Sequence, residues 1–198
     1  MRRCLLAALF SAAPMLLPIF VLHAEDSDRH TYQQSTVATY DYRFGSEMPF
    51  LPSNATTDTG EFISSKAFPS AEYCSHCHKE AHEQWRQSAH ANSFRAPWYV
   101  RNVNLLRDEK GIEYTRHCEG CHNPISLVSG SLTKGSKIDR SFDEDGVTCT
   151  VCHSIQKTDT RGTGSYVIAP PTALLDQNGR PVYGGHDPQA HRDLPAAA

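Results

Sequence analysis

The sequence predicts a mainly α-helical protein with extensive loops and one short β-ribbon. Three observations favour this fold class: two segments rich in helix-forming residues, short cysteine–histidine units spread through irregular sequence, and two short strand-like runs around a turn dipeptide. The chain has 198 residues, of which 39% are hydrophobic and 21% are charged. This is the size and composition of one globular domain, or of one domain with a tail, and it excludes a collagen-like or wholly disordered chain.

Two helices are predicted in the middle of the chain. The first covers residues 79–89, which contain good helix formers and neither Pro nor Gly. The second covers residues 98–110, where Pro97 stands at the start and Gly111 offers a stop.

Residues 130–145 are polar, contain glycines and show little periodicity, so they are predicted to form a surface loop. The β-ribbon is predicted from residues 166–168 and 181–183, which flank the turn dipeptide Asn178-Gly179.

The N-terminus has the pattern of a secretory signal peptide. Arg2 and Arg3 precede an apolar run that ends at Leu22, and the small residue Ala24 provides a cleavage position before Glu25. We therefore expect residues 1–24 to be removed on export, which places the mature chain in the periplasm or otherwise outside the cytoplasm. No later run is long enough to span a bilayer, so no stable membrane insertion is expected after cleavage.

The mature chain divides into two parts. Residues 25–70 are rich in Ser, Thr, Asp and aromatic residues without a sustained helical period, and they are predicted to form an extended arm or linker. Residues 71–198 contain every cysteine that remains after cleavage and are predicted to form the functional domain.

The charge balance argues against nucleic acid as a partner. The chain has 19 Lys and Arg residues against 22 Asp and Glu residues, a formal net charge of −3. No basic run stands out that would neutralise a phosphate backbone.

Six of the 7 cysteines form three C-x-x-C-H units. In such a unit, two thiols separated by two residues reach the two vinyl groups of one haem, and the adjacent histidine ligates the iron. The attachment cysteines are Cys74, Cys77, Cys118, Cys121, Cys149 and Cys152, and the proximal histidines are His78, His122 and His153. The sequence thus predicts three covalently bound c-type haems, with short helices and loops packed around stacked porphyrins.

Zinc and disulfides are the alternatives to haem. Two C-x-x-C pairs can hold one Zn²⁺, and an oxidising compartment favours disulfides. One zinc site would leave the third C-x-x-C pair without a role, and neither alternative explains a histidine directly after every pair.

The second axial ligand of each iron is expected to be histidine. Met48 is the only methionine left after signal cleavage, so at most one haem could have His/Met ligation. The remaining histidines of the mature chain are His30, His76, His82, His90, His117, His186 and His191. His117 is a candidate through its availability, His30 is expected to be an ordinary surface residue, and His76 is poorly placed for its own iron.

Several of these elements together resemble the multihaem cytochromes typified by the tetrahaem cytochrome c-554. The resemblance covers about residues 71–192, and its most specific parts are a W-x-x-S-x-H element from Trp85 to His90 and a G-V-x-C-x-x-C-H element from Gly146 to His153. It implies that His90 is a distal ligand to a haem other than the one attached just before it. A later family element, Y-G-P followed by D-P and a histidine, implies the same role for His191, although Gly185 here replaces the proline.

The family pattern commonly continues to a further C-x-x-C-H unit. This sequence therefore represents either a three-haem variant or a domain truncated at its C-terminus.

The leading functional hypothesis is a periplasmic cytochrome that relays single electrons between redox partner proteins, without a catalytic residue of its own. The first alternative is a haem oxidoreductase, or a module of one, that acts on a small nitrogen or sulfur compound at an open iron. The second is a sensory module that binds a gas. Seven spare histidines for three irons favour closed distal sites and hence the relay.

Overall fold

The computed structural model describes residues 17–76 and 78–171, with side chains described from residue 27 onward. This part of the chain is mainly helical and has one small sheet, so the predicted fold class is confirmed. Its α-helices are α1 (Leu17–Val37), α2 (Ala71–Ser75), α3 (Lys79–Arg86), α4 (Pro97–Lys110), α5 (Arg116–His122), α6 (Pro124–Val128) and α7 (Cys149–His153). Three 3₁₀ turns accompany them: η1 (Ser65–Ala67), η2 (Ile112–Thr115) and η3 (Ser141–Glu144).

Both helices predicted in the middle of the chain are present. Helix α3 ends at Arg86, three residues before the predicted end, and α4 begins at Pro97 and ends before Gly111. Gly111 has φ +111°, a backbone conformation that favours glycine, which explains why the helix stops there.

The sheet contains three short strands, β1 (Thr56–Thr57), β2 (Ile155–Thr158) and β3 (Tyr166–Ile168), in the order β1-β3-β2. Strand β3 pairs parallel with β1 and antiparallel with β2. The predicted strand at residues 166–168 is therefore confirmed. Its antiparallel partner is β2, whereas the predicted partner at residues 181–183 lies outside the described residues.

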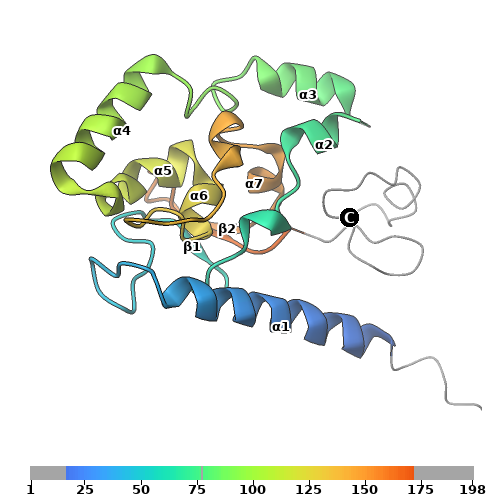
Figure 1. Ribbon diagram of the computed structural model, residues 1–198. Helices are drawn as coiled ribbons and strands as arrows, with labels where there is room; N and C mark the ends of the chain where they lie inside the picture. The colour runs from blue at the N-terminus through green and yellow to red at the C-terminus, as the bar shows by residue number, and fades with distance from the viewer. Residues whose placement is uncertain (1–16, 77, 172–198) are drawn as a thin grey trace, which may run out of the picture.

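The segment from residue 25 to residue 70 differs from the predicted extended arm. Its first part belongs to α1, which lies on the opposite side of the sheet from α2, α3 and α7 (Figure 1). Polar contacts hold this helix: the Tyr32 hydroxyl donates to the Ser129 carbonyl at 2.7 Å, and the Phe62 N–H donates to Gln33 Oε1 at 2.7 Å. A helix docked by hydrogen bonds needs no apolar stripe, which is why hydrophobic periodicity did not reveal it.

The rest of that segment contributes aromatic residues to the core. Tyr40, Phe50 and Phe62 are buried in one cluster with Leu127 of α6 and Leu132. The rings of Tyr40 and Phe62 lie 4.6 Å apart between centroids. The segment is therefore an integral part of the fold around the second C-x-x-C-H unit.

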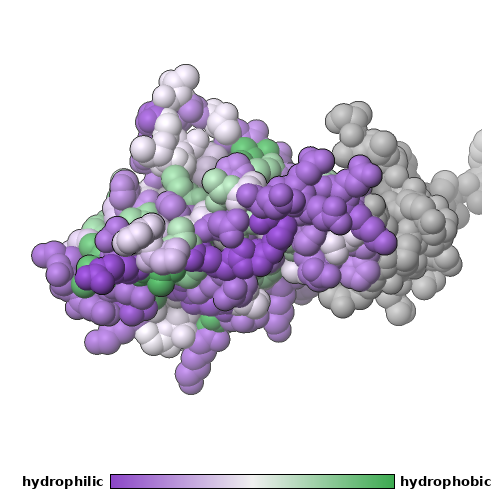
Figure 2. Space-filling model, turned by 90° about the horizontal axis from the view of Figure 1, so that it is seen from above, coloured by the Kyte–Doolittle hydropathy of each residue, from purple (hydrophilic) through white to green (hydrophobic). Residues whose placement is uncertain are grey.

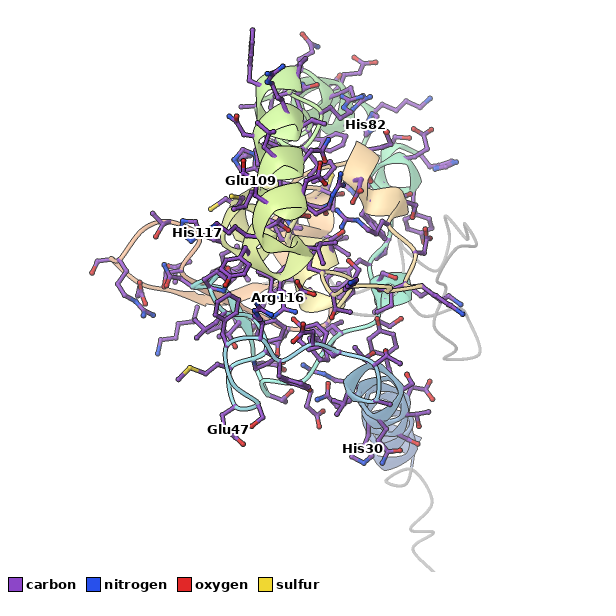
Figure 3. All side chains as sticks on the ribbon, turned by 60° about the vertical axis from the view of Figure 1, so that its left-hand side comes forward. His30, Glu47, His82, Glu109, Arg116 and His117 are labelled. Atoms are coloured by element: carbon purple, nitrogen blue, oxygen red, sulfur yellow. The ribbon has the colours of Figure 1, made fainter. Side chains whose placement is uncertain are left out.

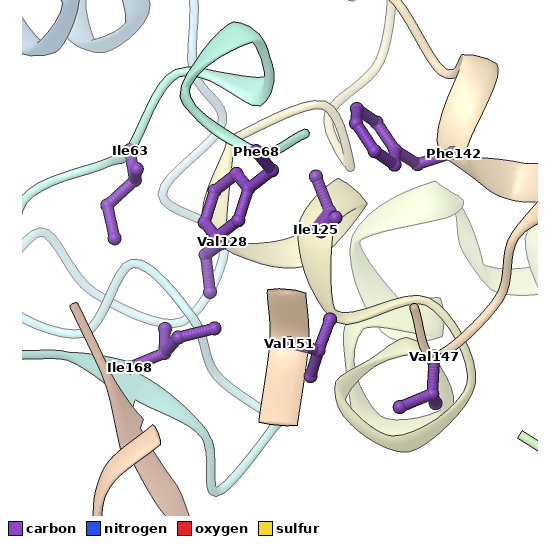
Figure 4. Close-up of a cluster of buried hydrophobic side chains, with 8 residues drawn as sticks. All are labelled: Ile63, Phe68, Ile125, Val128, Phe142, Val147, Val151 and Ile168. Atoms are coloured by element: carbon purple, nitrogen blue, oxygen red, sulfur yellow. The ribbon is translucent and has the colours of Figure 1, made fainter. Parts of the chain in front are cut away.

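A second cluster lies at the centre of the molecule, and Figure 4 shows its eight side chains. It joins residues before the first unit, between the second and third units, within the third unit and after it: Ile63, Phe68, Ile125, Val128, Phe142, Val147, Val151 and Ile168. The three units are thus attached to one core.

The predicted surface loop at residues 130–145 is only partly exposed. Residues 130–133 are buried, and Leu132 has no exposed surface. The guanidinium of Arg116 explains this burial, because its Nε donates to the Leu132 carbonyl at 3.0 Å and draws the chain inward. The exposed part of the loop begins at Lys134.

The face seen in Figure 2 is mainly hydrophilic, with small and separate hydrophobic patches. Among the described residues, no helix is both long and apolar enough to cross a membrane.

Candidate haem-binding site

The second and third C-x-x-C-H units are helical throughout. The second lies within α5 and the third forms α7. Residues at i, i+3 and i+4 share one face of a helix, so the two cysteines and the histidine of each unit project together. Cys121 and Cys152 are exposed, whereas Cys118 and Cys149 are half-buried. Each unit therefore presents one accessible face, which fits attachment of a flat cofactor.

The first unit spans the end of α2 and the start of α3. The His78 N–H donates to the Cys74 carbonyl at 3.0 Å, which keeps one helical turn across the unit. Cys77 lies outside the described residues. His78 itself has φ −107° and ψ 51° and precedes α3, so its backbone leaves the helical path that His122 and His153 follow.

The first and third units lie side by side. The thiols of Cys74 and Cys149 interact, and this interaction lowers the pKa of the Cys149 thiol and raises that of Cys74. Two further bonds join the same regions: the Ala71 N–H donates to Asp145 Oδ2 at 3.1 Å, and the Thr150 hydroxyl donates to the Pro69 carbonyl at 3.3 Å. Haems attached through Cys74 and Cys149 would therefore be bound at neighbouring positions on the protein.

The segment that follows α3 connects the third unit to the second. On one side, the Val147 N–H donates to the His90 carbonyl at 3.1 Å. On the other, the Ser93 hydroxyl donates to the His122 carbonyl at 2.8 Å. Residues 90–93 thus form a bridge between Val147, two positions before Cys149, and the predicted proximal histidine of the second unit, His122.

His122, the predicted proximal histidine of the second unit, has well-defined surroundings. Its Nδ1 donates to the Ser93 carbonyl at 2.7 Å, which leaves Nε2 as the nitrogen that can ligate a metal. The ring of Tyr99 stacks on the imidazole, with 3.8 Å between centroids and 8° between planes. Ser93 and Tyr99 were not among the residues predicted from the sequence, because no motif marks a backbone carbonyl or a single helical tyrosine as a group that orients a histidine.

A buried polar cluster lies beside the second unit. The Glu119 carboxylate is 3% exposed, 3.1 Å from an Arg140 guanidinium nitrogen, and accepts a hydrogen bond from Thr115 at 3.0 Å. Burial outweighs these two partners and raises the pKa of Glu119 to about 7. Glu119, Arg140 and Asp143 also line a cavity of about 270 Å³ with residues of α4.

The predicted distal ligands are distributed unevenly. His90 is exposed on the bridge just described. His117 is exposed at the start of α5, and its Nδ1 lies 3.3 Å from the Pro52 carbonyl oxygen. His191 and the alternative His186 lie outside the described residues.

The remaining histidines have local partners. His76 Nδ1 lies within 3.1 Å of two carbonyl oxygens of α2, and the ring of His82 lies 5.4 Å from that of Trp85. His30 lies at the opposite end of the molecule from His82, as Figure 3 shows, and contacts Gln34 and Glu61. These contacts agree with the expectation of a surface role for His30.

The donor set fits haem better than a tetrahedral metal. Each unit offers two thiols for thioether bonds and one neighbouring imidazole for iron. Within the described ranges, no three His, Cys, Asp or Glu side chains come together as a site for one metal ion.

Comparison with known protein families gives a match over the middle of the chain. Residues 73–154 match the family described as cytochrome c554 and c-prime. The matched range begins one residue before Cys74 and ends one residue after His153, so it contains all three units. This match confirms the predicted family for the segment that contains them. The comparisons with curated proteins and with solved structures give no match.

Proposed function

We propose that this c-type cytochrome, a member of the cytochrome c554 and c-prime family by the match over residues 73–154, relays single electrons between redox partner proteins through three haems. Membership of this family implies covalently bound haem iron and redox partner proteins. We propose in addition that there are three haems, that they relay electrons and that the protein is exported.

The observation that carries the relay is the adjacency of the attachment units. Hydrogen bonds from Ala71 to Asp145 and from Thr150 to Pro69 hold the first and third units together, and residues 90–93 connect the third unit to His122. Haems bound at such neighbouring positions exchange electrons without a large movement of the protein. When bound, each haem supplies a reversible one-electron iron couple.

The protein's own residues would hold the three groups and tune them. Six cysteines would form the thioether bonds: Cys74, Cys77, Cys118, Cys121, Cys149 and Cys152. His78, His122 and His153 would be the proximal ligands, with His90, His117 and His191 as distal ligands. Bis-histidine ligation is supported by the residue count, because Met48 is the only methionine after signal cleavage and could serve at most one of the three irons.

Export is part of the same proposal, because c-type haem is attached after the unfolded chain leaves the cytoplasm. Cleavage after Ala24 would remove the first part of α1. The contacts of Arg29, Tyr32 and Gln33 would remain in the mature chain and hold the rest of the helix.

Haem stoichiometry is the first test. Intact mass spectrometry of the exported protein should give the chain from Glu25 plus three haem masses, and peptide mapping should locate one haem on each unit. A protein that contains zinc, or a Cys74–Cys149 disulfide, in place of haem would contradict the proposal.

Reactivity distinguishes a relay from the alternatives. The reduced protein should be oxidised rapidly by a partner cytochrome in stopped-flow mixing and should form no carbon monoxide complex. A stoichiometric carbon monoxide complex at one haem, together with repeated turnover of nitrite or hydroxylamine, would establish an open catalytic iron. A carbon monoxide or nitric oxide complex without turnover would favour a gas sensor.

The distal role of His90 has its own test. His90→Ala should convert one haem to the high-spin state and leave all three attached, because attachment depends on the cysteines. The matched control is His30→Ala, which should leave the spectrum unchanged. An unchanged spectrum in His90→Ala would remove His90 from the ligand set.

A further inference from the structure

Contacts within the protein alone fix the orientation of the His122 imidazole. The Ser93 carbonyl accepts a hydrogen bond from Nδ1 at 2.7 Å, and Tyr99 lies parallel to the ring at 3.8 Å. His122 is half-buried, whereas His78 and His153 are exposed. The three proximal histidines thus have unequal surroundings.

Tyr99 is itself held in place. It lies in the first turn of α4, which begins at Pro97, and the ring of Phe94 meets it edge-on with 5.6 Å between centroids. The guanidinium of Arg140 lies over the Phe94 ring, 5.7 Å from its centre. A ring supported in this way restricts the rotation of the imidazole that it contacts.

We propose that Tyr99 is a positioning residue for the haem attached at Cys118 and Cys121. It keeps the His122 imidazole in the one orientation in which Nδ1 donates to Ser93 and Nε2 faces the iron. This inference rests on the proposed function, because it requires a haem at the second unit.

The hydrogen bond gives the orientation a redox consequence. A histidine that donates its second nitrogen to a carbonyl is a more basic metal ligand, and a more basic ligand stabilises the oxidised iron. Tyr99 therefore lowers the reduction potential of the second haem. Tyr99 orients His122 through the stacked face of its ring and not through its hydroxyl, because the buried hydroxyl has no hydrogen-bond partner among the described residues.

The test compares two substitutions at the same position. Tyr99→Leu removes the flat ring, and Tyr99→Phe keeps it. We expect Tyr99→Leu to raise the potential of one haem by the equivalent of a tenfold change in its reduction equilibrium, about 59 mV for one electron. The same variant should change one set of ferric low-spin EPR signals, whereas Tyr99→Phe should match the wild type in both measurements.

Two further variants make the result specific. Trp98→Leu is the matched control, because Trp98 is the neighbouring aromatic residue on α4 and is 80% exposed. It should leave potentials and EPR signals unchanged. Phe94→Leu loosens Tyr99 without touching position 99, and it should raise the potential of the same haem by a smaller amount, which tests the idea even if Tyr99→Leu fails to fold.

The inference is wrong if Tyr99→Leu leaves every potential and EPR signal unchanged, or if Tyr99→Phe changes them as much as Tyr99→Leu does. Should Tyr99→Leu not fold, unchanged signals in Phe94→Leu would overturn it. Peptide mapping of each variant separates this failure from failure of the proposed function. A peptide with Cys118 and Cys121 but no haem would refute the proposed function itself.

Discussion

The indole nitrogen of Trp85 donates a hydrogen bond to the carbonyl oxygen of Val147, 2.8 Å away and 62 positions later in the chain. The two residues belong to the two most specific elements of the family resemblance. A second bond, from the Val147 N–H to the His90 carbonyl, continues the same contact. The element that contains the predicted distal ligand His90 is thereby fixed to the start of the third unit.

Trp85→Phe should remove this bond while it keeps an aromatic ring. We expect the free energy of unfolding of the haem-loaded protein to fall by about 1 kcal/mol, the usual net value of one hydrogen bond. Urea denaturation followed by circular dichroism measures the change. Trp98→Phe is the control, and this exposed position should change stability by less than about 0.5 kcal/mol. Equal effects at the two positions would show that the bond contributes nothing.

Gly146→Ala should disturb the same junction through the backbone. Gly146 has φ +61°, and a Cβ there would clash with the Ser93 hydroxyl and lie 2.7 Å from the His90 carbonyl oxygen. Gly135 has φ +76° with nothing within 4 Å of such a Cβ, so Gly135→Ala introduces the conformational strain alone. We expect Gly135→Ala to cost about 1 kcal/mol and Gly146→Ala a further 1–3 kcal/mol, approximately the cost of overpacking. Thermal unfolding of the two variants in parallel measures the difference in their stability. Equal stability of the two variants would mean that residues 90–93 do not pack on Gly146.

Local signals in the sequence made two of the helices, α3 and α4, predictable. Helix α4 has Pro97 at its first position and Gly111 after its last, and both signals act within a few residues. The C-x-x-C-H units were identifiable for the same reason, because the spacing of their cysteines and histidine is the spacing that haem attachment requires.

Long-range polar contacts were not predictable in this way. Helix α1 docks through Tyr32 and Gln33, whose partners Ser129 and Phe62 lie far along the chain. The orientation of His122 depends on a backbone carbonyl, which every residue possesses. The sequence therefore predicts which side chains can bind haem, but not the contacts that orient those side chains.

Arg116 provides a test of how the N-terminal segment is held. It is fully buried, its guanidinium donates to the carbonyls of Leu132 at 3.0 Å and of Asp41 at 2.8 Å, and it lies 4.3 Å from the centre of the Tyr40 ring. Figure 3 shows it at the centre of the molecule.

Arg116→Ala would leave both carbonyls unsatisfied, and we expect it to lower the free energy of unfolding by at least about 2 kcal/mol. Urea titration measures this loss. Arg101→Ala, at an exposed position on α4, should be within about 0.5 kcal/mol of the wild type. A stable Arg116→Ala protein would mean that the hydrogen bonds of Arg116 do not contribute measurably to holding the N-terminal segment.

Glu119 should make stability depend on pH. Burial raises the pKa of its carboxyl from 4.5 to about 7, so the folded protein holds a proton that the unfolded chain releases. The stability that comes from this proton is fully present below about pH 4.5 and is lost as the pH rises through about 7. A difference of this size corresponds to about 3 kcal/mol of unfolding free energy.

Glu119→Gln keeps the shape of the side chain and replaces the titratable carboxyl with a neutral amide. The unfolding free energy of the wild type should therefore fall relative to that of Glu119→Gln between pH 4.5 and 7, and the difference should stay constant at higher pH. Urea unfolding of both proteins at intervals of pH gives the two curves. Glu109→Gln, an exposed change on α4, should follow the wild-type curve. Parallel curves for the wild type and Glu119→Gln would mean that the carboxylate is charged in the folded protein throughout this range and that Arg140 outweighs its burial.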